Sequence, residues 1–285
     1  MSESLDELMS DFADTYANYV LQADDREGAT ETANSYLFDR YAATYRDGSD
    51  VEPLGGLEGL KELPLGLDDK LSPDVIGKGF DGVIARLQGQ KETGSYYTPE
   101  EVVEFMVQQT VRPRIREKLA DAGIEVSELD DAPEPEALAE VCSPDEAEQV
   151  LADISSLSIL DPACGSGQFL AGAVDEVSEL RAALASRAEI DAPKVAHVWQ
   201  AATSNVYGVD LLPEAVEMAK LRLKLRTLAS FPGWAPDEDL EEIREGRALH
   251  WQIKQGNSLI GFVEIPDEIG ETEVNQAALT GGEWA

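Results

Sequence analysis

Apolar positions near the start of the chain recur with the period of an α-helix. Leu8, Phe12, Tyr16 and Val20 are spaced four residues apart, which places them on one face of an amphipathic helix. The pattern predicts one or two helices within residues 5–37. A further helix is expected from Ser72-Pro73, a typical helix start. We therefore expect residues 1–90 to form a helical N-terminal region.

Farther along, short apolar runs end at an acidic residue. One run, residues 157–160, precedes Asp161. Another run, residues 206–209, precedes Asp210, and residues 250–253 are a weaker candidate for a third strand. Segments with helical periodicity follow the first two runs, which indicates an α/β fold with ligands at the carboxyl ends of the strands. The predicted helices cover residues 168–184 and 193–202 and a segment that opens at Pro213.

The loop after the first predicted strand reads D-P-A-C-G-S-G-Q-F-L and contains two glycines. Glycine allows a sharp turn and a close approach of a ligand to the backbone. A dinucleotide-binding loop would have a glycine where Leu170 stands, and a phosphate-binding loop would have a lysine where Gln168 stands. Asp161 at the strand end would repel a phosphate and would suit a cation or an ammonium group.

This loop strongly resembles motif I of the S-adenosylmethionine-dependent DNA methyltransferases that modify adenine N6. S-adenosylmethionine carries an ammonium and a sulfonium and no phosphate, so the charge argument agrees with the resemblance. G-V-D-L around Asp210 resembles motif II, in which the acid accepts hydrogen bonds from the ribose hydroxyls, although an acid there can also cap a helix. G-N-S-L-I-G around Asn257 resembles motif III, which reads the cofactor's adenine, although Gly-Asn is also a common turn.

Upstream, G-S-Y-Y-T-P resembles motif X of the same family, a turn that closes over the methionine end of the cofactor. The residues alone also explain T-P-E-E as a helix start, with Thr98 as the cap, Pro99 in the first helical position and Glu101 completing a capping box. We expect both roles together. The resemblance implies S-adenosyl-L-methionine as cofactor, and it implies these cofactor-binding residues: Tyr97, Thr98, Asp161, Ala163, Gly165, Gly167, Gln168, Phe169, Asp210, Leu211 and Asn257.

The family's motif IV, an Asp, Asn or Ser followed by Pro-Pro and an aromatic residue, is missing because the chain contains no Pro-Pro pair. In the family this motif stacks the flipped adenine and holds its amino group. No catalytic residue is therefore assigned, and the chain is expected to be a split or truncated methyltransferase that is inactive alone. The alternatives are a non-catalytic S-adenosylmethionine-binding subunit or remnant that assembles with a partner, and a methyltransferase that acts on RNA or protein.

The formal net charge of the 285 residues is -35. This acidity resembles proteins of salt-loving archaea, because at about 1 M salt the screening length is roughly 3 Å. DNA-binding proteins usually have a basic face, so double-stranded DNA is expected to be gripped mainly by other parts. The basic run Arg112, Arg114, Arg116 and Lys118 fits either a solvated helix end or a nucleic-acid contact.

Two cysteines do not make a disulfide framework, and Cys164 fits the loop as a small residue, with no nucleophilic role expected. Neither histidine has a ligand spacing around it, so no metal site is predicted. The lack of a signal peptide and of a long apolar run predicts a cytoplasmic protein without membrane contact.

The predicted architecture is an incomplete Rossmann-like methyltransferase sheet with a helical N-terminal region. Residues 91–285 would form the N-terminal part of the S-adenosylmethionine-binding domain. Residues 121–152 within it are acidic and read as an exposed helical insert or linker. About three of the family's seven strands are expected, so an apolar sheet edge would need a partner. A complementing C-terminal fragment or a specificity subunit would supply it.

Overall fold

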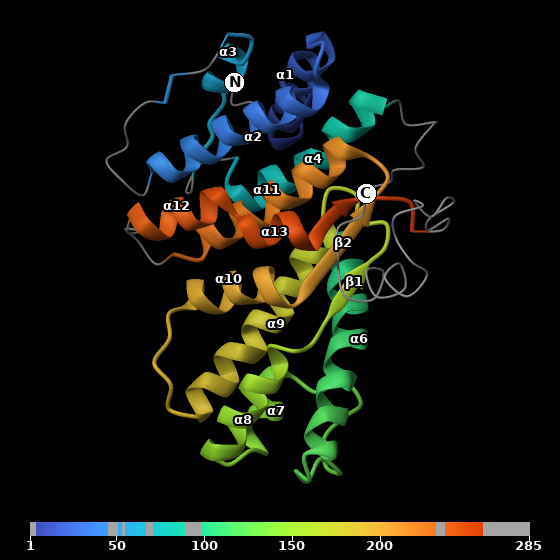
Figure 1. Ribbon diagram of the computed structural model, residues 1–285, viewed down its shortest axis with the longest axis vertical. Coiled ribbons are helices and arrows are strands. Elements are labelled where there is room, and N and C mark those ends of the chain that lie inside the picture. Colours follow the sequence, from blue (N-terminus) through green and yellow to red (C-terminus); the bar gives the residue numbers. More distant parts are fainter. Residues whose placement is uncertain are drawn as a thin grey trace, which may run out of the picture.

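The computed structural model describes residues 4–44, 51–52, 55–66, 71–88, 98–231 and 237–258. Within these ranges, helices surround a small parallel sheet (Figure 1). The N-terminal helices are α1 (Leu5–Gln22), α2 (Arg26–Ala43), α3 (Glu58–Lys61) and α4 (Pro73–Gln88). The remaining elements are α6 (Glu100–Asp121), α7 (Pro135–Glu140), α8 (Pro144–Ile154), β1 (Ile159–Asp161), α9 (Gln168–Arg187), α10 (Lys194–Ser204), β2 (Val206–Asp210), α11 (Pro213–Ala229), α12 (Asp237–Glu245), α13 (Arg247–Gln252) and β3 (Ile253–Gln255).

The sheet has the strand order β1-β2-β3, and both strand pairs are parallel. Ile159 lies opposite Val206, and Gly208 lies opposite Ile253. The strand–helix alternation confirms a partial Rossmann-like arrangement in the described residues. Strand β1 is an edge of this sheet, and its Leu160 side chain is 61% exposed. The exposed edge presents both apolar surface and peptide groups that a further strand can pair with.

The N-terminal helices build a hydrophobic core together with α11 and α12. The apolar face predicted for α1 is buried, and its Phe12 ring packs against Tyr16 and Phe80. The Tyr16 hydroxyl donates a hydrogen bond to Asn34 Oδ1 at 2.7 Å, which satisfies a polar group in this core. Met218 and Leu225 of α11 belong to the same core. The core of the N-terminal region therefore continues across residue 90 into the segment that follows β2.

A second hydrophobic core lies under the sheet and contains the opposite side of α11, with Val216, Ala219 and Leu223. Segment 121–152 is helical in part, and most of its residues are exposed, while α7 and α8 each bury an apolar face. Leu138 and Val150, from α7 and α8, are buried in this core, and both helices pack against α9. The many acidic residues of the segment hid the apolar face that it turns toward α9.

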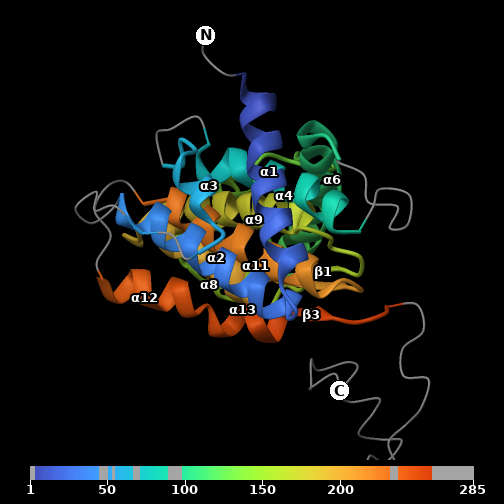
Figure 2. The same ribbon diagram turned by 90° about the horizontal axis from the view of Figure 1, so that it is seen from above.

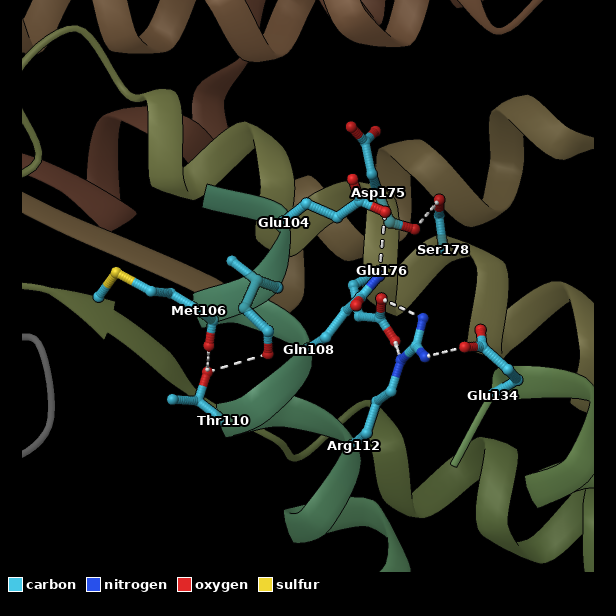
Figure 3. Close-up of polar contacts among 10 residues, drawn as sticks. Glu104, Met106, Gln108, Thr110, Arg112, Glu134, Asp175, Glu176 and Ser178 are labelled. Carbon is cyan, nitrogen blue, oxygen red and sulfur yellow. Dashed lines mark hydrogen bonds and ion pairs between the residues drawn. The ribbon is translucent and has the colours of Figure 1, made fainter. Parts of the chain in front are cut away.

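Helix α6 is fastened to α9 by a buried ion pair. Arg112 Nε donates to Glu176 Oε1 at 2.6 Å, and the two side chains are 5% and 6% exposed. Figure 3 shows the Arg112 guanidinium between Glu176 and Glu134. Arg112 Nη1 lies 2.7 Å from Glu134 Oε1. The basic run is thus not a solvated helix end throughout, because its first arginine pairs with an acid 64 residues later.

Two local predictions differ from the structure by a few residues. The N-cap of α6 is Pro99, without a side-chain capping bond, so Thr98 does not cap and the predicted capping box is wrong. The carbonyl of Pro99 instead accepts the first helical bonds. The third strand begins at Ile253 and not at His250, because residues 247–252 form α13.

Viewed from above, α12 and α13 lie on the side of the molecule opposite α6 (Figure 2). No described helix is long and apolar enough to cross a membrane.

Candidate functional site

The loop between β1 and α9 is shaped by its glycines. Gly165 has φ +53° and Gly167 has φ +82°, both in the left-handed region that favours glycine. A Cβ atom on Gly167 would lie 2.9 Å from the Cβ of Ala219, so the loop also passes close to α11. The Cys164 amide donates to the carbonyl of Val209 in β2 at 2.9 Å. These features explain why the sequence pairs two glycines at this strand end.

The Asp210 carboxylate joins the first loop to the second. Its Oδ2 accepts the Gly165 amide at 2.8 Å, and its Oδ1 accepts the Leu212 amide at 3.0 Å. Both oxygens therefore face backbone N–H groups of loops at the carboxyl edge of the sheet. The acid sits at the predicted strand end and organises both turns.

The loop after β3 closes over the other two. The Gly256 amide donates to the Asp210 carbonyl at 2.9 Å, and the Ser258 hydroxyl donates to the Pro162 carbonyl at 2.6 Å. Asn257 stands between these two contacts, and its side chain is exposed. The structure thus brings the segments around Asp161, Asp210 and Asn257 together at one edge of the sheet, as expected for a binding site in an open α/β sheet.

Asp161 differs from Asp210 in its bonding. Its Oδ1 accepts the Ala163 amide at 3.0 Å, and among the described residues no donor reaches its Oδ2. Burial raises the pKa of Asp161, and the nearby Asp210 charge raises it further against the lowering effect of the Ala163 amide. A cationic ligand group placed at Oδ2 would relieve this unfavourable charge.

Cys164 is buried and its thiol is not activated. Burial raises the pKa of Cys164 well above its ordinary value, and the charges of Asp210 and Asp161 act in the same direction. A thiol in this state is a poor nucleophile because the thiolate is the reactive form. This supports the prediction that Cys164 fills space in the loop.

The other predicted site residues are placed less uniformly. Tyr97 lies outside the described residues, and Thr98 directly precedes the N-cap of α6, half-buried, with no hydrogen bond to the three loops among the described residues. Gln168 is turned away from the strand ends, because its Oε1 accepts a bond from Arg222 Nη1. Ala163 and Leu211 are exposed beside the loops, and Phe169 packs on the second core.

Three residues that the sequence did not predict as functional, Asp81, Ser166 and Arg222, hold the loop between β1 and α9 on the side away from the strand ends. Ser166 is 2% exposed, and its hydroxyl donates to Asp81 Oδ1 of α4 at 2.5 Å. Arg222 of α11 donates through Nη2 to the same hydroxyl at 2.8 Å. Asp81 and Ser166 are 85 residues apart, so no local signal could have revealed this contact. In the sequence of α11, cations alternate with leucines; such a pattern is typical of a helix whose long cationic side chains bury their stems, and it identifies no partner for Arg222.

A cavity of about 340 Å³ lies between α4, α6, α9 and α11. It is lined by Gln168 and Arg222 but not by Asp161, Asp210 or Asn257. The cavity is therefore behind the loop and separate from the strand ends. No group of three or more His, Cys, Asp or Glu side chains in the described ranges is arranged to hold a metal ion.

With this geometry in view, the chain compares with proteins of one functional class, the DNA methyltransferases. Residues 138–231 match the family described as MmeI, DNA-methyltransferase domain. That range contains β1, β2, α9 and α11, and hence the loops of Asp161 and Asp210.

The chain is also similar to a putative type II restriction enzyme and methyltransferase, RM.MjaORFECS2P, from Methanocaldococcus jannaschii. The two are 30% identical over 209 residues, which is 68% of this chain and 17% of the relative. The chain thus spans about 17% of the length of the curated relative that it matches. No solved structure shows a significant match. Together the comparisons support a methyltransferase domain of the restriction-modification type.

Proposed function

We infer that the chain contains the S-adenosyl-L-methionine-binding part of a site-specific DNA methyltransferase that acts on adenine N6. The observation that carries this proposal is the bond from the Gly165 amide to Asp210 Oδ2 at 2.8 Å. It joins the glycine loop and the second acidic strand end into one site. The match of residues 138–231 to a DNA-methyltransferase domain supports the same class.

The polar groups at the strand ends fit the proposed cofactor. Asp161 Oδ2 is an acceptor for the ammonium group of the methionine moiety, and the Asp210 carboxylate is an acceptor for ribose hydroxyls. The exposed Asn257 amide can both donate to and accept from the adenine. Tyr97 and Thr98 would cover the methionine end, while Ala163, Gly165, Gly167 and Leu211 would complete the site. Gln168 and Phe169 would take part through their backbone, since their side chains contact Arg222 and the second core. When bound, the cofactor supplies a methyl group on a positively charged sulfur.

The methyl acceptor requires residues that the chain does not supply as a recognisable motif. Adenine N6 is a weak nucleophile, so transfer depends on holding the base and the methyl group in line. The sequence has no Pro-Pro pair and hence no motif IV. We propose that the target base is held by a further segment or a partner that also pairs with the exposed β1 edge, where Leu160 is 61% exposed. A non-catalytic subunit that binds the cofactor is the second candidate, favoured by the same missing motif.

Calorimetric titration in molar salt tests the cofactor. S-adenosylmethionine should bind, whereas ATP should not, because Asp161 opposes phosphate at the strand end. Asn257→Ala should weaken S-adenosylmethionine by about fivefold, the value of roughly one hydrogen bond. Asn18→Ala, the same change at an exposed position of α1, should have no effect. Equal binding of ATP, or no binding of S-adenosylmethionine, would refute the assignment.

Methyl transfer separates the two candidates. The chain would be combined with the remainder of a restriction-modification methyltransferase that contains motif IV, and labelled methyl groups on duplex DNA would be counted. Incorporation into N6-methyladenine supports the enzyme. Cofactor binding without transfer to DNA, under conditions where a complete control enzyme is active, supports the non-catalytic subunit.

A further inference from the structure

The candidate cofactor loop has a polar attachment to the N-terminal helical region. Ser166 lies between the two left-handed glycines, Gly165 and Gly167, and its side chain is buried away from the strand ends. Its hydroxyl donates to Asp81 Oδ1 at 2.5 Å and accepts from Arg222 Nη2 at 2.8 Å. The hydroxyl thus donates one hydrogen bond and accepts another, and its two partners belong to α4 and α11.

Arg222 connects this attachment to α4. The residue is 6% exposed, and its guanidinium donates to the carbonyl of Gly77 and to Gln168 Oε1 besides Ser166. It also lies over the Phe80 ring, 6.0 Å from its centroid. The planar arginine fork can reach several acceptors at fixed angles, and a lysine ammonium cannot reproduce this. One side chain of α11 therefore contacts both ends of the turn, at Ser166 and Gln168, and the backbone of α4.

The attachment bears on the front of the loop through a single residue. Gly165 precedes Ser166, and the Gly165 amide is the donor to Asp210 Oδ2. The Gly165 amide belongs to the rigid peptide group before Gly165, and only the φ and ψ rotations of Gly165 separate that group from the next one, which carries Ser166. A shift of Ser166 would therefore move this amide when those two rotations are held by the loop contacts. The position of α4 is thus transmitted to the bond that joins the two acidic strand ends.

We propose that Asp81, Ser166 and Arg222 are positioning residues that fix the glycine loop and thereby make cofactor affinity depend on the N-terminal helical region. The cofactor part of this proposal rests on the function proposed above, while the loop-ordering part stands without it. Displacement of α4, by a partner or by substitution, would loosen the loop and weaken cofactor binding without any change in a cofactor-contacting side chain.

The first test measures loop order without a cofactor. Hydrogen–deuterium exchange followed by mass spectrometry would be recorded for peptides that cover residues 162–170 of the whole chain. Ser166→Ala removes both hydroxyl contacts and should speed exchange of the Gly165 and Gly167 amides roughly tenfold, the consequence of losing one or two hydrogen bonds. Ser178→Ala is the matched control, since Ser178 is also buried but donates to the Asp175 carbonyl within α9. Unchanged exchange in Ser166→Ala would overturn the proposal.

The second test adds rescue and affinity. Asp81→Ala should raise loop exchange and weaken S-adenosylmethionine by about tenfold, whereas Asp81→Asn retains an acceptor for the Ser166 hydroxyl and should remain within about twofold of the parent. Thermal unfolding would verify that both variants are folded. Equal affinities for the two variants, with the parent binding normally, would overturn the positioning role. If the parent binds no S-adenosylmethionine, the proposed function fails, and the exchange data still decide whether Asp81 orders the loop.

Discussion

The two acidic strand ends look alike in sequence and differ in what they hold. Asp210 uses both carboxylate oxygens on backbone amides, at 2.8 Å to Gly165 and 3.0 Å to Leu212. Within the part of the chain that the structure describes, Asp161 has one such bond, at 3.0 Å to Ala163 within its own loop. Asp210 thus contributes to the architecture of the site through two backbone amides. Asp161 Oδ2 accepts no bond from the described residues and can receive a cationic group, and its half-buried charge is unfavourable without one.

The contrast between Asp161 and Asp210 would not hold if removal of any acid in this region weakened cofactor binding. Glu176→Gln tests this with the largest expected effect on stability. Removing the charged partner of Arg112 should lower the free energy of unfolding by about 3 kcal/mol, because both side chains are buried. Denaturant unfolding measures the change, and S-adenosylmethionine affinity should stay at the parent value.

Glu134→Gln is the matched control, since this acid contacts the same arginine but is 71% exposed. Its effect should be below about 1 kcal/mol. Comparable losses in both variants would mean that burial of the Arg112–Glu176 pair does not determine its contribution.

Asp210→Ala should come next in size. It removes the acceptor for amides of two loops, so a loss of about 2–3 kcal/mol in unfolding free energy is expected, together with loss of cofactor binding. Asp210→Asn retains one carbonyl acceptor and should fall between the parent and the alanine variant. The assignment to architecture fails if Asp210→Ala unfolds at the same denaturant concentration as the parent.

Asp161→Asn should have the opposite sign on stability. Burial raises the pKa of Asp161, so the folded state binds its proton more tightly than the unfolded chain does. Its stability contribution is therefore lost as pH rises through the raised pKa. At neutral pH the uncharged amide should leave stability equal or raise it by up to about 1 kcal/mol. Thermal unfolding at pH 7 checks the sign, and clear destabilisation would contradict the contrast with Asp210.

The smallest expected effect is the contribution of a histidine to the pH dependence of stability. Burial lowers the pKa of His197 below its ordinary value of 6.5, and the Arg181 charge lowers it further. Because the unfolded chain then binds the proton more readily, stability should fall as pH drops below 6.5. His197→Gln should reduce that fall by less than about 1 kcal/mol. His250→Gln should act in the same direction, because burial and the Lys220 charge also lower the pKa of His250; an unchanged pH dependence in both variants would contradict the role of burial.

The elements that the sequence predicted are those with a local pattern. The helical spacing of Leu8, Phe12 and Tyr16 and the apolar runs before Asp161 and Asp210 required only neighbouring residues, and the corresponding helix and strands are present. Local rules also misplaced boundaries. Thr98 and Pro99 have the composition of a helix start, but the predicted N-cap lies one residue before the observed one. The sequence predicts a strand over residues 250–253, and residues 247–252 form α13 instead.

The parts of the site that the sequence did not reveal depend on long-range contacts. Ser166 reads as a small loop residue, and only the fold brings Asp81 to its hydroxyl. Arg112 reads as part of a solvated basic run, yet Glu176 draws it into the core. Buried polar groups select partners by tertiary geometry, so composition and periodicity could place these residues on helices but could not pair them.

We propose that Asp161 receives the ammonium of a bound S-adenosylmethionine at the edge organised by Asp210. The direct measurement is calorimetric titration of the parent and of Asp161→Asn, in molar salt, with S-adenosylmethionine and with 5′-methylthioadenosine, which lacks the amino-acid end. Asp161→Asn should weaken S-adenosylmethionine by at least about tenfold, the value of one charge-assisted bond, and leave 5′-methylthioadenosine unchanged. Equal weakening of both ligands, or no binding of S-adenosylmethionine to the parent, would contradict the claim.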